Sequence, residues 1–152
     1  MTEGKWTYNN IPDQSGRVAL VTGGASGIGF HISLMLAKKG AKVIITYRDF
    51  NRAKEAINKI VAEHPLADLA IVKLDLTDLK SVATCADEVK KGYQQLDLLI
   101  NNAGIMVPPF VQTLQGFESQ IGTNHLGISH LPVSCCLCLC SPPAHGLSLY
   151  QA

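Results

Sequence analysis

The sequence predicts an α/β protein with a doubly wound parallel sheet, truncated to about the first four β–α units. From residue 16 to about residue 131, short apolar runs alternate with helix-length amphipathic segments, and a glycine-rich turn joins the first run to the first helix. Such alternation is typical of parallel strands joined by right-handed helical crossovers. We therefore expect an N-terminal arm at residues 1–15 and one incomplete α/β domain at residues 16–131.

Four buried strands are predicted from short runs rich in apolar and β-branched residues. These runs are Arg17–Thr22, Val43–Tyr47, Leu69–Leu76 and Leu96–Ile100. Continuous apolar runs of this length are typical of strands that are covered on both faces. We expect the strand order 3-2-1-4, with the glycine-rich turn at the carboxyl edge of the sheet.

Four helices are predicted from apolar residues that recur at helical spacing. The apolar face of the first helix is Ile28, Ile32, Met35 and Leu36, and that of the second is Ala53, Ala56, Ile57, Ile60 and Val61. The third helix has the apolar face Val82, Ala86, Val89 and Tyr93. The fourth places Phe117, Ile121, Asn124 and Ile128 on one face. Thr77 is the expected N-cap of the third helix, because a threonine hydroxyl can accept from the first unpaired amides. The fourth helix is expected from Leu114 to about Leu131.

The charges of this chain are unevenly placed. The 152 residues carry a net charge of +1, and all 13 Lys and Arg residues lie between Lys5 and Lys91. After Lys91 only Asp97 and Glu118 are charged. A net charge this small argues against nucleic acid or an anionic membrane as a partner held by bulk electrostatics. Any mechanism that needs a lysine in the second half of this chain is excluded.

Residues 132–152 are predicted to be an aperiodic tail, rich in cysteine and proline and without charge. The cluster Cys135, Cys136, Cys138 and Cys140 could hold a soft metal, or it could be an accidental run. Structural zinc usually takes C-x₂₋₄-C pairs with further ligands, so we predict no metal site. The clustering is also unlike a disulfide framework, which favours a reducing, cytoplasmic compartment. We expect no signal peptide and no transmembrane segment, because the apolar runs are too short.

The glycine-rich turn is the first candidate site. Thr22 to Gly29 reads TGGASGIG, directly after a strand and at the start of a helix. Glycines there allow a sharp turn and close approach of the backbone, and a helix N-terminus favours a pyrophosphate. Gly23, Ser26, Gly27, Ile28 and Gly29 are therefore candidate cofactor-binding residues, with a plain tight turn as the alternative.

At this point the chain resembles the short-chain dehydrogenase/reductase family, whose signature is TGxxxGIG. Further matches follow in order: Leu74-Asp75-Leu76, Asn101-Asn102-Ala103-Gly104 and Thr123-Asn124-His125-Leu126-Gly127. The resemblance implies a Rossmann-like fold, a nicotinamide dinucleotide held by Asp75, Leu76, Asn102, Ala103 and Gly104, and Asn124 as the active-site asparagine. Asp75 could instead be only a strand-end residue. The segments YRDFNRA and GFESQIGTNHLG resemble the retinol-dehydrogenase-like branch.

The end of the second strand bears on the choice of cofactor. In this fold an acidic residue there binds the 2′-hydroxyl of NAD, whereas an arginine accommodates the 2′-phosphate of NADP. The strand ends at Tyr47, and Arg48 follows it. We predict NADP, with NAD possible if the strand extends far enough to bring Asp49 to the ribose. Arg48 could also be a solvated loop residue, with Asp49 capping the next helix.

The family's acid–base apparatus is a Tyr-x-x-x-Lys pair with a serine, and the resemblance does not extend to it. Tyr150 is the only tyrosine after Tyr93, and no lysine follows it. We therefore expect a cofactor-binding half of an alcohol/carbonyl oxidoreductase that is inactive by itself. Two alternatives stay open. The first is a non-catalytic module that senses nucleotide or pairs with a second copy or a full-length relative, and the second is a thiolate metal-binding polypeptide.

Overall fold

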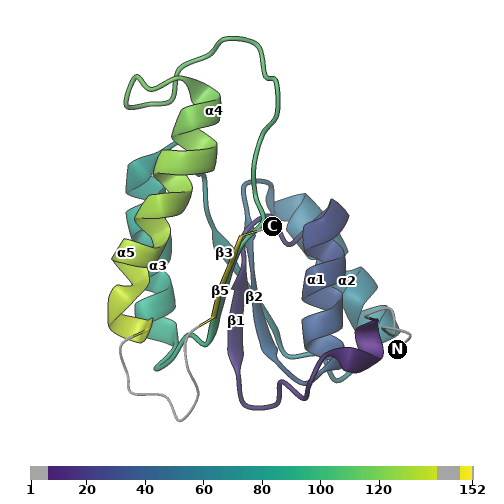
Figure 1. The fold of residues 1–152 in the computed structure, drawn as a ribbon. Helices are drawn as coiled ribbons and strands as arrows, with labels where there is room; N and C mark the ends of the chain where they lie inside the picture. Colours follow the sequence, from purple (N-terminus) through teal and green to yellow (C-terminus); the bar gives the residue numbers. More distant parts are fainter. Residues whose placement is uncertain (1–6, 140–147, 152) are drawn as a thin grey trace, which may run out of the picture.

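A parallel sheet with helices on both faces forms the molecule (Figure 1). The computed structural model describes residues 7–139 and 148–151. The strands are β1 (Val18–Val21), β2 (Lys42–Tyr47), β3 (Leu69–Lys73), β4 (Leu98–Asn101) and β5 (Ser148–Gln151). The helices are η1 (Tyr8–Asn10, 3-10), α1 (Gly27–Lys38), α2 (Phe50–Glu63), α3 (Leu79–Gly92), α4 (Ser119–Ile121), the π-helical turn η2 (Gly122–Gly127) and α5 (Ile128–Leu139). The strand order is β3-β2-β1-β4-β5, which confirms the predicted order 3-2-1-4.

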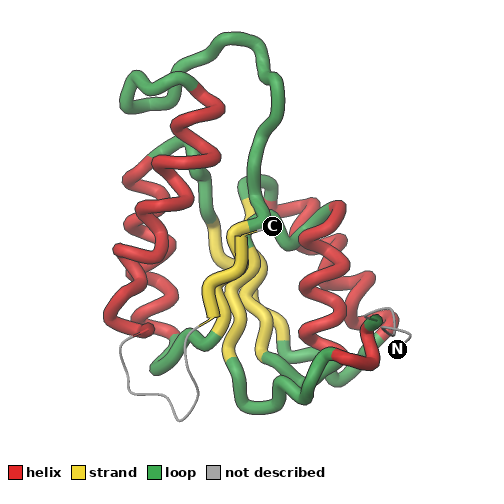
Figure 2. The backbone as a smooth tube through the Cα atoms, viewed as in Figure 1, coloured by secondary structure: helices red, strands yellow, loops and turns green. Residues whose placement is uncertain are grey.

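The two faces of the sheet carry separate cores. Figure 2 shows helices on either side of the strands, with α1 and α2 on one face and α3 and α5 on the other. Along β1, Ala19 and Val21 pack with residues of α1 and α2, whereas Leu20 packs with residues of α3 and α5. All three side chains are fully buried. Because successive strand residues point to opposite faces, a short apolar run such as β1 serves both cores.

The first β–α unit departs from prediction at one position. Ile28 was expected on the buried face of α1, but its side chain is 71% exposed. Leu34 and Leu36 are buried instead, and Ile32 is partly buried against the same core. Ile28 lies in the first turn of α1, beyond the end of β1, so the sheet does not cover it.

The cap of α3 also differs from prediction. Asp78, not Thr77, is the N-cap, and its carboxylate accepts from the amide of Lys80 at 3.0 Å. Thr77 instead donates its hydroxyl to Asp75 Oδ1 at 2.7 Å. Both residue types are good caps, and Asp78 takes the role because Thr77 is already bonded to the preceding turn.

The fourth helical stretch begins later than predicted and changes its period. Leu114 lies outside the helix, which starts after Glu118, where the carboxylate accepts from the amides of Gln120 and Ile121 at 2.8 and 2.9 Å. The π-helical turn η2 then rotates the buried face relative to a uniform helix. As a result the expected inward residues Phe117, Ile121 and Asn124 are exposed, whereas Gly122, Thr123, Gly127 and Ile128 are buried.

Regular structure continues past residue 132, where the prediction ended it. Pro132 lies inside α5, although a proline in a helix removes a backbone donor and costs about 3 kcal/mol. Ile128 and Leu131, just before it, are buried against α3, and this packing offsets the cost. A fifth strand, β5, pairs in parallel with β4 and places Tyr150 opposite Ile100. The expectation of an aperiodic tail is therefore wrong for 132–139 and 148–151.

Candidate functional site

A cleft of about 560 Å³ lies at the carboxyl edge of the sheet. The predicted cofactor-binding residues that line it are Gly23, Ser26, Arg48, Asp75, Leu76, Asn102, Ala103 and Gly104. They come from the ends of four strands that are far apart in sequence, which is where ligands bind in open α/β sheets. A second hollow of about 390 Å³ adjoins the cleft, and both are lined by Ala25, Ser26 and Arg52.

The glycine-rich turn is shaped by two kinds of glycine. Gly23 and Gly27 have positive φ of 65° and 53°, which only glycine adopts without strain. A Cβ on Gly29 would lie 2.5 Å from Asn102 Nδ2. The backbone at Gly29 therefore lies so close to Asn102, the residue after β4, that only glycine fits. By contrast, the space around Gly27 is open to 4 Å. The turn thus packs tightly against the protein at Gly29 and leaves room for a ligand at Gly27.

The N-terminus of α1 faces this open space with unpaired donors. Ser26 is the N-cap and is exposed, and the amide of Phe30 makes the first intrahelical bond, to the Ser26 carbonyl at 3.1 Å. The amides of Ile28 and Gly29 precede that bond, so they remain available to an anion. A pyrophosphate fits this position by charge and by donor supply.

Thr22, which the sequence analysis did not select, joins the turn to the end of β4. Its buried hydroxyl accepts from the amides of Asn102 and Ala103, both at 3.0 Å, and Oγ1 lies 3.3 Å from the Ile100 carbonyl. The Asn102 side chain donates back to the Thr22 carbonyl at 2.9 Å. The position of Thr22, directly before the first glycine, was the available signal. These bonds hold two walls of the cleft together.

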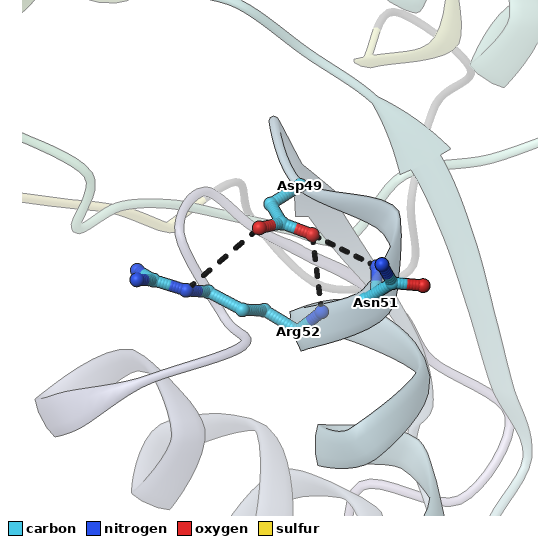
Figure 3. A network of polar contacts seen from close by, with 3 residues as sticks. All are labelled: Asp49, Asn51 and Arg52. Carbon is cyan, nitrogen blue, oxygen red and sulfur yellow. Dashed lines mark hydrogen bonds and ion pairs between the residues drawn. The ribbon is translucent and has the colours of Figure 1, made fainter.

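The end of β2 shows where Asp49 lies and what it contacts. The strand ends at Tyr47, as predicted, and Asp49 is the N-cap of α2. Its Oδ1 accepts from the amides of Asn51 and Arg52 at 2.9 and 3.3 Å, and its Oδ2 lies 3.9 Å from Arg52 Nε (Figure 3). Asp49 is therefore engaged in a local cap, and it also lines the cleft. Arg48 lines the cleft, as does Arg52, which sequence reasoning missed.

Asp75 closes the turn after β3 and also lies in the wall of the cleft. Its Oδ1 accepts from the amide and the hydroxyl of Thr77 at 2.9 and 2.7 Å, which closes the turn after β3. The backbone amide of Asp75 donates to the Ser81 hydroxyl at 2.9 Å. Asp75 also lines the cleft together with Leu76. The side chain is thus a turn residue that contributes a carboxylate to the wall of the site.

Asn124 lies at the other side of the site and does not line the cleft itself. Its amide group makes two bonds with the backbone of Ile105: Oδ1 accepts from the amide at 2.9 Å, and Nδ2 donates to the carbonyl at 2.7 Å. The neighbouring Thr123 does line the cleft, and its buried hydroxyl has no hydrogen-bond partner among the described residues. Sequence reasoning missed Thr123 because the π-helical turn brings it inward.

Other kinds of site receive no support from the described residues. Within 7–139 and 148–151, no group of three or more His, Cys, Asp or Glu side chains could hold a metal ion. The same part of the chain contains no helix that is long and apolar enough to cross a membrane. Cys140 and the side chains of Cys135, Cys136 and Cys138 lie outside what is described, so the thiolate hypothesis stays a prediction.

The cleft lies at the carboxyl edge of the sheet, next to the N-terminus of α1, and Arg48 and Arg52 line it. This arrangement suits a phosphorylated nucleotide. Comparison with known proteins agrees: residues 17–138 match the family model described as short chain dehydrogenase. The chain belongs to the short-chain dehydrogenase family. The matched range contains the four β–α units and the four sequence motifs on which the resemblance was based.

Several relatives of this chain are similar over most of its length. An uncharacterized oxidoreductase of Schizosaccharomyces pombe is 44% identical over 122 residues, 80% of this chain and 36% of that protein. Retinol dehydrogenase 12 of Bos taurus is 39% identical over 119 residues, 76% of this chain and 38% of that protein. The chain thus spans a little over a third of the length of these relatives.

Solved structures share the fold. A protein of Mycobacterium paratuberculosis has a TM-score of 0.76 at 40% identity, over 88% of this chain and 46% of that one. A metagenomic short-chain oxidoreductase in complex with NADP has a TM-score of 0.75 at 26% identity, over 91% of this chain and 62% of that one. The latter protein was solved with NADP bound to it.

Proposed function

We propose that this chain is the cofactor-binding half of an NADP(H)-dependent oxidoreductase that acts on an alcohol/carbonyl pair, in the retinol-dehydrogenase-like branch. The observation that carries the proposal is the arrangement at one sheet edge, where the exposed Arg48 lines the cleft and Gly27, with open space around it, lines the adjoining hollow. The NADP bound by a homologous structure and the match to retinol dehydrogenase 12 support the cofactor and the branch.

Each part of the dinucleotide has a matching group in the cleft. The amides at the start of α1 would hold the pyrophosphate, and Arg48 would pair with the 2′-phosphate, because a guanidinium is permanently charged and can donate two parallel bonds. Asp75 and Leu76 would flank the adenine, and Asn102 to Gly104 would border the nicotinamide ribose. The bound cofactor supplies hydride transfer, whereas the chain binds and orients it.

The proton that accompanies hydride transfer has no donor of the family type here. Asn124 is bonded in both directions to Ile105, and a carboxamide does not titrate near neutral pH. The sequence contains no lysine after Lys91, and so no Tyr-x-x-x-Lys pair. Loss of general acid–base catalysis typically costs about 10²–10⁴-fold in rate. We therefore propose that this chain by itself binds cofactor without steady-state turnover.

The test is a titration of the purified chain with NADPH and NADH, followed by nicotinamide fluorescence. NADPH should bind about 10- to 100-fold more tightly, because a hydrogen bond to a charged group contributes about 1.5–3 kcal/mol. Arg48→Asp should erase or reverse this preference, and Gly27→Trp should abolish binding of both dinucleotides by filling the open space. Equal affinities of the unmodified chain would contradict the NADP assignment.

The same preparation tests catalysis at 340 nm, the absorbance band of the reduced nicotinamide. No sustained change is expected with primary alcohols, aldehydes or ketones. A sustained rate that Gly27→Trp abolishes would overturn the proposal of inactivity. A rate that persists in this variant would come from a contaminating enzyme.

A second candidate function, association with a partner chain, is favoured by one specific observation. The segment after β4 exposes large apolar side chains, among them Met106, Val107, Phe110 and Leu114, each at least 78% exposed. Contiguous apolar exposure of this kind is unusual for a monomer in water. We propose a second copy or a full-length relative as the partner, and sedimentation at increasing concentration tests the first of these directly.

A further inference from the structure

Thr123 carries a buried hydroxyl whose hydrogen-bonding capacity is unused within the described part of the chain. The residue is 6% exposed and lines the cleft, and its Oγ1 makes no hydrogen bond to residues 7–139 or 148–151. A buried hydroxyl without a partner destabilises a fold, and in native proteins such a group commonly marks the place of a bound molecule. The cleft beside it is where that molecule would lie.

The other threonines that line the cleft use their hydroxyls within the protein. Thr46 Oγ1 accepts from the Gly23 amide at 3.3 Å, and Thr77 donates its hydroxyl to Asp75 Oδ1 at 2.7 Å. Both groups are therefore fixed in place before any ligand arrives. The Thr123 hydroxyl differs from them, because no described residue competes with a ligand for it.

The local backbone explains how this hydroxyl can serve a ligand. In an α-helix a threonine hydroxyl commonly bonds to the carbonyl three or four residues earlier. Thr123 lies in the π-helical turn η2 and makes no such bond to a described residue. A rotation about χ1 that exchanges the hydroxyl and the methyl group therefore breaks no hydrogen bond to those residues. The hydroxyl can turn to the cleft when a partner is bound there.

The packing of η2 places Thr123 near one end of the cleft. Gly127, the last residue of η2, has no room for a Cβ, which would overlap the Leu76 carbonyl oxygen. The turn thus packs directly on the segment after β3, and Leu76 and Thr77 of that segment line the cleft. In the proposed function this wall flanks the adenine. Thr123 is accordingly assigned to the adenosine end of a bound dinucleotide.

We propose that the Thr123 hydroxyl binds the adenosine half of the cofactor, and that it is left unpaired in the ligand-free chain at a cost in stability. This inference rests on the proposed cofactor binding, and it adds a neutral contact that does not depend on the 2′-phosphate. Adenosine supplies both donors and acceptors to a hydroxyl. Removal of the hydroxyl should therefore stabilise the ligand-free chain and weaken nucleotide binding, which are effects of opposite sign.

The experiment measures the Tm of the ligand-free chain and its affinity for four ligands. NADPH and NADH are titrated by nicotinamide fluorescence, and 5′-AMP and nicotinamide mononucleotide compete against NADPH. Thr123→Val replaces the hydroxyl with a methyl group of similar shape, so Tm should rise by about 2–4 °C. NADPH, NADH and 5′-AMP should each bind about 2- to 10-fold more weakly, the usual effect of one neutral hydrogen bond. Nicotinamide mononucleotide should bind as before.

Two comparisons isolate the hydroxyl from the packing of the side chain. Thr123→Ala and Thr123→Ser both lose the methyl group, and only the serine variant should retain the affinity for 5′-AMP. Thr113→Val is the matched control, because Thr113 is also buried but lines neither hollow. The Thr113 hydroxyl accepts from the Phe117 amide at 3.2 Å, so this substitution should lower Tm and leave binding unchanged.

The outcomes separate this inference from the function on which it rests. A higher Tm with unchanged affinities in Thr123→Val would overturn the inference. A lower Tm would also overturn it, since the hydroxyl would then have a partner in the ligand-free chain. Weaker binding of nicotinamide mononucleotide instead of 5′-AMP would refute the adenosine assignment. In all three cases, an unmodified chain that prefers NADPH through Arg48 leaves the proposed function standing, whereas binding of neither dinucleotide would overturn both.

Discussion

The two halves of the carboxyl edge are held together differently. On the β2–β3 side, Asp49 and Asp75 bond to groups two or three residues away. On the β4 side, Asn124 bonds to Ile105 across 19 residues, and Gln115 to Asp78 across 37. The first side is therefore built within each β–α unit, whereas the second forms only when the long loop after β4 folds back (Figure 2).

Apolar exposure differs in the same way. On the β2 side, the exposed ring of Phe50 packs edge-on against Tyr47, with centroids 5.7 Å apart. On the β4 side, Met106 and Phe110 are 86% and 80% exposed, and Val107 adopts a positive φ of 48°. A β-branched residue in that region carries backbone strain. The β2 side is therefore held by contacts between residues close in sequence, whereas the β4 side depends on contacts between residues far apart in sequence.

The junction between the two sides should be the most sensitive point. Gly29→Ala would place a Cβ 2.5 Å from Asn102 Nδ2 and closer still to the Gly23 carbonyl oxygen. Because backbone must shift, we expect a loss of about 3 kcal/mol in unfolding free energy and of dinucleotide binding. Urea denaturation measures the first and fluorescence titration the second.

Gly92→Ala is the control for this substitution. A Cβ at Gly92, the last residue of α3, would meet no atom within 4 Å, and its φ is not positive. We expect a gain of about 0.4–1 kcal/mol from the less flexible unfolded chain. A Gly29→Ala protein as stable as Gly92→Ala would show that the two sides are not packed together there.

The next largest loss of stability is expected when the hydrogen bonds of Thr22 at the same junction are removed. Thr22→Val removes the hydroxyl that accepts from the Ala103 amide while keeping the side-chain shape. A buried donor left without a partner costs about 1–3 kcal/mol, so the denaturation midpoint should fall accordingly. Thr22→Ser keeps the hydroxyl and should recover most of the loss. Equal stability of the Val and Ser variants would contradict a role for this bond.

The β4 side should respond locally to the loss of Asn124. Asn124→Ala removes both bonds to Ile105, worth about 0.5–1.5 kcal/mol each, at a site exposed to water. We expect faster amide hydrogen exchange at Ile105 with little change in global unfolding. Gln120→Ala is the comparison, because the Gln120 side chain accepts from the Val107 amide and its loss should affect exchange there. A global loss of stability in Asn124→Ala would mean that the two sides are more strongly coupled than proposed.

The smallest effect on stability is expected when acid protonates the Asp78 carboxylate. The hydrogen bond from Gln115, and then that from the Lys80 amide, hold the pKa of Asp78 below its ordinary value of 3.8. A lowered folded-state pKa means that the carboxylate stabilises the fold above about pH 4 and that this contribution is lost as pH falls through the folded value. Asp78→Asn should therefore lower Tm slightly at neutral pH and match the unmodified chain in strong acid.

Asp87→Asn isolates the contact between Asp78 and the loop. The Asp87 pKa is also lowered, by its bond to Lys90, but Asp87 lies on α3 away from the loop after β4. Both substitutions should show the same pH trend, and only Asp78→Asn should accelerate hydrogen exchange at Leu114, near Gln115. Accelerated exchange in both variants would argue against the Gln115 contact as the cause.

The β2 side was predictable from sequence because its signals are local. A run of β-branched residues predicted β2, and a strand followed by glycines and a helix predicted the glycine-rich turn. The end of the strand at Tyr47 predicted that Arg48 would lie at the cleft. The β4 side was not, because no local pattern distinguishes a π-helical turn from a regular one, and this turn decides that Thr123 rather than Asn124 lines the cleft. Pro132 likewise indicated a stop that packing against α3 overrides.

The surface position of the turn after β2 has a consequence for how cofactor choice can change. Arg48, Asp49 and Arg52 are all exposed, while the strand before them is buried from Val43 to Thr46. Single substitutions at these three positions can therefore change the local charge without disturbing either hydrophobic core. If the proposed function holds, the preference between phosphorylated and unphosphorylated cofactor can therefore be engineered at the surface, without a change in the buried strand beneath it.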